Sequence, residues 1–223
     1  MNVIILAAGK GSRLGMPHPK CLTRLKTGES ILERQINSLS KYVDKKYISI
    51  VVGFQKELII NQFPECNFII NNEYNNTNTS KSLLCALKQK QNSDIIWLNG
   101  DVVFESNILA PLIKSKHSCM LVNRNSTSEE EVKYNIKSNG TIKQVSKEIN
   151  DGLGEAVGIN KILQIHIKKF IQALEECSNQ DYFEFAIEKL INRNISIYPI
   201  DISSRLCMEI DFKEDLDMVN KKL

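Results

Sequence analysis

The sequence predicts an open α/β sheet, largely parallel, with helices on both of its faces. Short apolar runs alternate with longer stretches of helical period, which is typical of βαβ units. The first apolar run leads directly into a glycine-rich loop, as ligand-binding strands of such sheets do. At 223 residues the chain is long enough for one large core, so we expect a single domain over residues 1–223.

The individual elements follow from their local patterns. Strands are predicted over 3–8, 47–54, 67–72, 94–100 and 119–123, and helices over 29–43, 56–63, 79–90 and 106–115. Residues 132–148 contain two alternating stretches around Asn139-Gly140, which predict a two-residue β-hairpin. A strand over 155–162, helices over about 163–177 and 181–193, a strand over 195–202 and a helix from about Lys213 complete the prediction.

Composition excludes several classes of function. The formal net charge is only +3, far below the basic excess of a dedicated nucleic-acid binder, so we expect no nucleic-acid partner. No apolar stretch is long enough to cross a membrane and the start lacks a signal peptide, so we expect no membrane insertion and a cytoplasmic location. The six cysteines and three histidines are scattered without metal-binding or redox spacing, which predicts reduced thiols.

The loop after the first strand, AAGKGSRLGMPHPK, predicts a phosphate site. A dinucleotide-binding GxGxxG motif starting at Gly9 would need glycine at Leu14, and the second strand ends in Gly53-Phe54 without an acid. The P-loop pattern fails as well, because no GK[ST] follows at its spacing. What remains is a turn whose free N–H groups, together with Ser12 and Arg13, can surround an anion.

The same stretch, read as GxGxR followed by PK, resembles the signature of nucleotidyltransferases that join an NTP to a phosphorylated small molecule. The resemblance implies a Rossmann-like three-layer α/β/α sandwich with a small β-hairpin elaboration. It also implies a nucleotide-binding half over residues 1–125 and an acceptor-side half over 126–223. The catalytic cations would be Arg13 and Lys20, and the nucleotide would lie on Leu6, Ala7, Ala8, Gly9, Gly11, Ser12 and Arg13. The short segment between Arg13 and Lys20 departs from many hexose-activating members.

Two aspartates are candidate Mg²⁺ ligands. Asp101 follows a predicted buried strand, at the sheet edge where ligands of parallel sheets bind. Asp211 lies between a short apolar segment and the last predicted helix. The resemblance implies that both hold the metal, while local turn chemistry allows Asp101 to cap a turn and Asp211, with Glu214, to form a helix capping box.

Two further segments are similar to binding segments of the family. Residues 73–88 resemble the part that contacts base and ribose in cytidylyltransferases, which suggests Asn78, Ser80 and Ser82 as a group, although a plain helix cap is the alternative. GEAVGINK and DYFEFAIEKLI suggest an acceptor site with Glu155, Tyr182 and Glu184, whose rings and carboxylates suit an ammonium group.

The resulting hypothesis is a Mg²⁺-dependent cytidylyltransferase. Its partners would be CTP and a phosphorylated amine such as phosphocholine, phosphoglutamine or aminoethylphosphonate, used to decorate a cell-surface polysaccharide. The match is to small bacterial cytidylyltransferases for phosphocholine and phosphoglutamine, and a homodimer is compatible with it. A sugar-1-phosphate nucleotidyltransferase using UTP or dTTP and a non-catalytic nucleotide-binding regulatory module remain as alternatives.

Overall fold

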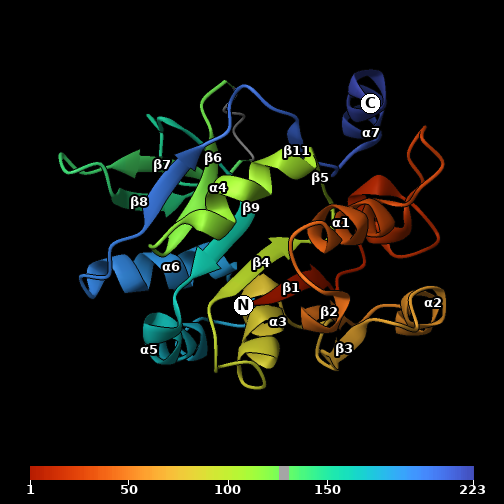
Figure 1. The fold of residues 1–223 in the computed structure, drawn as a ribbon, viewed down its shortest axis with the longest axis horizontal. Coiled ribbons are helices and arrows are strands. Elements are labelled where there is room, and N and C mark those ends of the chain that lie inside the picture. Colours follow the sequence, from red (N-terminus) through yellow and green to blue (C-terminus); the bar gives the residue numbers. More distant parts are fainter. Residues whose placement is uncertain (126–130) are drawn as a thin grey trace.

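One mixed sheet organises the molecule (Figure 1). The structure, a computed structural model, describes residues 1–125 and 131–223. Seven strands of the sheet lie in the order β10-β6-β9-β4-β1-β2-β3, and the β7–β8 hairpin joins the sheet by pairing of β7 with β9. The strands of this sheet are β1 Asn2–Ala7, β2 Ile48–Val52, β3 Asn67–Ile70, β4 Ile95–Asn99, β6 Cys119–Asn123, β7 Lys133–Ile136, β8 Ile142–Ser146, β9 Gly154–Ile162 and β10 Tyr198–Asp201.

Helices cover both faces of the sheet, as the sequence predicts. One face is covered by α1 Ile31–Ser40, α2 Lys56–Gln62 and α4 Leu109–Lys114. The other is covered by α3 Thr79–Leu87, α5 Gln164–Glu175 and α6 Phe183–Asn192. The α1 helix begins at a capping box between Ser30 and Glu33, which satisfies its first backbone N–H groups. The predicted α/β class with a mostly parallel sheet is confirmed.

The strand directions explain where a site can form. Strands β1, β2, β3 and β4 are parallel, as are β6 and β10, while β9 runs antiparallel to both β4 and β6. The carboxyl ends of β1, β4 and β6 therefore meet the amino end of β9 at one edge. Glu155, at the start of β9, pairs in register with Asn123 at the end of β6. Ligands of open α/β sheets bind at this edge.

Two features of the fold depart from the sequence prediction. The hairpin turn is longer than two residues: Lys137 N–H donates to Thr141, and Gly140 adopts φ 80° within a three-residue loop. A second, two-stranded antiparallel sheet of β5 Val102–Phe104 and β11 Cys207–Glu209 was not predicted. Strands of three residues carry too little periodicity to be recognised. This small sheet leads into α7 Lys213–Lys222 and brings the C-terminal segment back to the end of β4.

Candidate functional site

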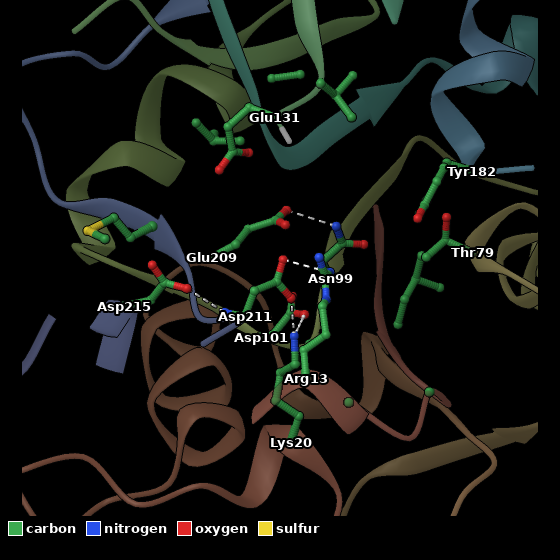
Figure 2. Close-up of a pocket in the computed structure, with 18 of the residues that line it drawn as sticks. Arg13, Lys20, Thr79, Asn99, Asp101, Glu131, Tyr182, Glu209, Asp211 and Asp215 are labelled. Atoms are coloured by element: carbon green, nitrogen blue, oxygen red, sulfur yellow. Dashed lines mark hydrogen bonds and ion pairs between the residues drawn. The ribbon is translucent and has the colours of Figure 1, made fainter. Parts of the chain in front are cut away.

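A cavity of about 1030 Å³ opens at the edge where β1, β4, β6 and β9 meet. Figure 2 shows its central side chains, with Arg13 and Lys20 facing Asp101 and Asp211. Most of the predicted site residues line it: Leu6, Ala7, Gly9, Gly11, Ser12, Arg13, Lys20, Asn78, Asp101, Glu155, Tyr182, Glu184 and Asp211. We call the part around Gly9–Arg13, Lys20, Asp101 and Asp211 the loop end. The part around Glu131, Glu155, Tyr182 and Glu184 is the glutamate end.

The glycine loop brings its lysine very close to its own backbone. Gly11 has φ 60°, which favours glycine, and a Cβ at this position would lie 2.5 Å from Cβ of Lys20. Any other residue at Gly11 would therefore displace the Lys20 stem. Lys20 itself begins a short 3₁₀ helix, Lys20–Leu22, directly after Pro19. The loop thus fixes where the ammonium group can lie.

The loop end is held together by ion pairs. The ammonium Nζ of Lys20 lies 2.8 Å from Asp101 Oδ2 and 2.5 Å from Asp211 Oδ1. The Arg13 guanidinium lies 2.7 Å from Asp211 Oδ2 and stands over the Phe212 ring at 5.4 Å from its centroid. Burial lowers the pKa of Lys20, but Asp101 and Asp211 outweigh it and leave the pKa raised. Lys20 therefore stays a cation.

The capping role proposed for Asp211 belongs to another residue. Asp215 Oδ2 accepts hydrogen bonds from the backbone N–H groups of Asp211 and Phe212, at 3.0 and 2.8 Å. Asp215 thus satisfies the backbone N–H groups at the start of α7 and also lines the cavity. The Asp211 carboxylate is turned toward Lys20 and Arg13 instead.

The donor set at the loop end fits a hard divalent cation. Among the described residues, buried Asp101 Oδ1 has no hydrogen-bond partner, while Oδ2 of the same carboxylate binds Lys20. Within the described residues, no three His, Cys, Asp or Glu side chains gather closely enough to hold a metal by themselves. Mg²⁺ is commonly held by one or two carboxylates that act together with substrate phosphates. Asp101 and Asp211 could supply such a pair.

At the glutamate end, the carboxyl groups of Glu155 and Glu184 lie in a part of the cavity wall that is poorly solvated. Burial, and next the charge of Glu131, raise the pKa of Glu155 to about 7, although Asn123 Nδ2 donates to it at 3.0 Å. Burial likewise raises the pKa of Glu184 to about 7, against a backbone hydrogen bond and the charge of Lys147. Both groups titrate near neutral pH, where a cationic ligand would favour their ionised forms.

Lys147 and Tyr182 connect the hairpin to this wall. Lys147, which follows β8, stands over the Tyr182 ring at 5.0 Å from its centroid. Tyr182 is the residue before α6 and is 42% exposed, so its ring is accessible from the cavity. The hairpin and the start of α6 thus form one boundary of the glutamate end.

Comparisons with known proteins fix the family. MobA-like NTP transferase domains match residues 3–178. The chain belongs to this family. Over its full length it is 27% identical to the CTP:phosphoglutamine cytidylyltransferase of Campylobacter jejuni, and the alignment covers 100% of both chains. It is therefore a member of a nucleotidyltransferase family.

Solved structures agree with the fold. The CTP:phosphocholine cytidylyltransferase of Streptococcus pneumoniae superposes with a TM-score of 0.83 at 19% identity, over 99% of this chain and 98% of that one. The inositol-1-phosphate CTP transferase of T. maritima gives a TM-score of 0.83 at 20% identity, over 99% of this chain and 93% of that one. At these identities the likeness concerns the fold.

Three predicted residues of this nucleotidyltransferase lie outside the cavity wall. Ala8 is buried, and its carbonyl accepts a hydrogen bond from Phe54 N–H at 3.0 Å. Ser82 is buried and accepts a hydrogen bond from Asn71 Nδ2 at 3.0 Å. Ser80 has no exposed surface. The two serines are therefore corrected to interior positions, because the first turn of α3 points them into the core.

Asn78 has a different role from the two serines. Its Oδ1 accepts a hydrogen bond from Thr79 N–H at 2.8 Å, which makes Asn78 the N-cap of α3. Its Nδ2 donates to the carbonyl of Gln180 at 3.2 Å, and its side chain lines the cavity. Asn78 therefore caps α3 and also lines the cavity.

Sequence reasoning missed Glu209 and Asn99. Glu209 accepts a hydrogen bond from Asn99 Nδ2 at 3.0 Å, and both lie in the middle of the cavity (Figure 2). Burial, and next the charge of Asp101, hold the pKa of Glu209 well above its usual range. Gly158, at φ 68°, leaves room for this pair, because a Cβ there would lie 2.6 Å from Glu209 Oε1. The sequence did contain one signal for Glu209: it lies two residues before Asp211 in an extended segment, so both side chains would point to the same side.

No described helix is long and apolar enough to cross a membrane.

Proposed function

We propose that this chain is a cytidylyltransferase that transfers CMP from CTP to a small phosphorylated amine and releases pyrophosphate. The acceptor would be of the phosphocholine, phosphoglutamine or aminoethylphosphonate kind. The reaction would take place in the cytoplasm, and its product would be used to decorate a cell-surface polysaccharide. The observation that carries the proposal is the division of one cavity into a loop end with two cations and a glutamate end with buried carboxyl groups. The names of the Campylobacter jejuni and Streptococcus pneumoniae relatives support the choice of nucleotide.

The chemistry assigned to the loop end is an in-line phosphoryl substitution. An oxygen of the acceptor phosphate attacks the α-phosphorus of CTP, a new P–O bond forms, and the bond to the β-phosphate oxygen breaks. Negative charge grows on the α-phosphate and on the departing pyrophosphate. Lys20 would stabilise the first charge, and the loop N–H groups with Arg13 and Ser12 would bind the second. No covalent intermediate with the protein is required.

Asp101 and Asp211 are the residues that would hold Mg²⁺. When bound, this ion would neutralise phosphate charge during the transfer. Glu155 and Glu184 would bind the ammonium group of the acceptor, with the Tyr182 ring beside it. Asn78 would contact the nucleotide from the start of α3.

A pyrophosphate-release screen tests the proposal. Four NTPs are each combined with phosphocholine, phosphoglutamine, aminoethylphosphonate and glucose 1-phosphate, with and without Mg²⁺. We expect release only with CTP, a phosphorylated amine and the metal. Turnover of UTP or dTTP with the hexose phosphate, and of no amine, would establish the sugar-nucleotide alternative. CTP binding without release under every condition would establish the regulatory module.

A further inference from the structure

Arg13 and Lys20, the two cations proposed to bind phosphate, both form ion pairs with the Asp211 carboxylate. Asp211 Oδ1 binds the Lys20 ammonium at 2.5 Å, and Asp211 Oδ2 binds the Arg13 guanidinium at 2.7 Å. The same ammonium also binds Asp101 Oδ2 at 2.8 Å. Lys20 therefore lies between the two carboxylates that could hold a divalent cation, and its ammonium group engages one oxygen of each.

The surroundings keep the ammonium in this position. The Lys20 side chain is only 10% exposed, and the loop backbone at Gly11 packs against its stem. The ammonium group does not reach Asp101 Oδ1, which is buried and has no hydrogen-bond partner in residues 1–125 and 131–223.

We propose that Lys20 is a built-in competitor of the metal, which fills the Asp101–Asp211 pair until nucleotide phosphates draw it away. The inference rests on the proposed function, because it assumes that these aspartates are the metal ligands. A phosphate that attracts Lys20 and Arg13 frees the carboxylates, and the freed carboxylates can then bind the cation. Nucleotide and metal therefore favour each other's binding, and the nucleotide-free protein binds metal weakly.

The physical reason is competition between charges for the same oxygens. A divalent ion that enters beside an ammonium group meets like-charge repulsion, and it finds carboxylate oxygens already engaged in charge-assisted hydrogen bonds. Replacing Lys20 with a neutral side chain removes both obstacles. A residue that only contacts phosphate would leave metal binding in the absence of nucleotide unchanged.

The test measures Mn²⁺ binding to the nucleotide-free protein, by electron paramagnetic resonance of the free ion. We expect Lys20→Met to bind Mn²⁺ on the order of tenfold more tightly than the wild type, the scale of one charged hydrogen bond. Lys20→Arg keeps the charge and should stay near the wild type. Lys10→Met removes an exposed cation from the same loop and should also stay near the wild type.

A second measurement locates the gained site. The double variant Lys20→Met with Asp101→Asn should lose the gain, because it removes one ligand of the pair. Thermal unfolding provides a readout without activity: Mn²⁺ should raise the melting temperature of Lys20→Met more than that of the wild type, since the ion compensates two otherwise repelling carboxylates.

The outcomes separate this inference from the proposed function. Equal or weaker Mn²⁺ binding by Lys20→Met, or a gain that persists without Asp101, would overturn the competition while leaving a cytidylyltransferase intact. If neither the wild type nor any variant bound the ion, even with CTP present, the metal site of the proposed function would fail as well.

Discussion

At the loop end of the cavity each aspartate has a cation within ion-pair distance, whereas at the glutamate end burial is the main influence on the carboxyl groups and raises their pKa values. Asp101 and Asp211 contact Lys20 at 2.8 and 2.5 Å, and these pairs keep the lysine charged. Glu155 and Glu184 instead have pKa values raised to about 7. The loop-end carboxylates are thus paired with cations before a ligand arrives. The Asn123 hydrogen bond to Glu155 and the charge of Lys147 near Glu184 only partly offset burial at the glutamate end.

This difference indicates which charge a substrate group must carry to bind at each end. Phosphates that enter the loop end must draw Lys20 and Arg13 away from the carboxylates, so a polyanionic triphosphate together with a metal ion suits this exchange. An ammonium group entering the glutamate end provides the charge that buried carboxyl groups lack. Loss of a charge should therefore lower kcat at the loop end and raise the acceptor KM at the glutamate end, and the following variants use that contrast.

The largest effect is expected for Lys20. Lys20→Met should lower kcat by about 10²-fold or more, because it removes a preorganised charge from the attacked phosphate. The acceptor KM should stay within about twofold, since Glu155 and Glu184 are untouched. Steady-state pyrophosphate release measures both constants, and circular dichroism checks that folding is intact. A variant with near-native kcat would take Lys20 out of the mechanism.

The aspartates should show a smaller loss that responds to metal. Asp101→Asn and Asp211→Asn keep the side-chain volume but remove the charge that would hold Mg²⁺, so we expect kcat to fall by about 10- to 100-fold at fixed metal concentration. Raising Mg²⁺ should recover part of the loss. Asp215→Asn is the matched control: it alters the cap of α7 and should change stability more than metal dependence.

Should Asp101→Asn and Asp211→Asn equal the wild type at every Mg²⁺ concentration, both aspartates would be structural, and the loop end would stabilise phosphates through its cations alone.

At the glutamate end, charge removal should affect the acceptor alone. Glu155→Gln and Glu184→Gln should each raise the KM for phosphocholine by about tenfold, because each removes one carboxylate from a partly desolvated ion pair with the amine. The KM for CTP should remain unchanged. Glucose 1-phosphate, tested in parallel, would lose only neutral hydrogen bonds and should change less.

The pH dependence of the wild type gives an independent check. With pKa values near 7, Glu155 and Glu184 are mostly neutral at pH 6 and mostly ionised at pH 8. The phosphocholine KM should therefore fall as pH rises through 7, and each Gln variant should weaken that dependence. A pH profile identical in the wild type and both variants would argue against ion pairing with the acceptor.

The sequence predicted the loop end better than the glutamate end, for a physical reason. The loop end is built from one contiguous segment, residues 6–20, and from aspartates placed at the ends of apolar segments. Glu209 escaped prediction because its place depends on a three-residue strand paired with β5 and on the missing side chain of Gly158. Likewise, sequence alone did not indicate that the cations and carboxylates of the loop end pair with one another.

The start of α3 shows the same limit at single-residue scale. Asn78, Ser80 and Ser82 are polar and close in sequence, so they appeared equivalent. Helix geometry separates them, because only Asn78 precedes the helix and reaches the cavity, while Ser80 and Ser82 turn inward. Which face a short polar helix start presents depends on tertiary packing, and that information is not local.

The smallest expected effect tests this separation. Asn78→Ala should raise the KM for CTP by about threefold, the lower range for one neutral hydrogen bond. Ser82→Ala is the control from the same helix turn: it removes the acceptor of the Asn71 bond and should lower the melting temperature without changing either KM. Kinetics and thermal unfolding of the two variants measure this contrast. An unchanged KM for Asn78→Ala would reduce Asn78 to a helix cap, whereas a raised KM for Ser82→Ala would mean that nucleotide recognition extends into the core behind α3.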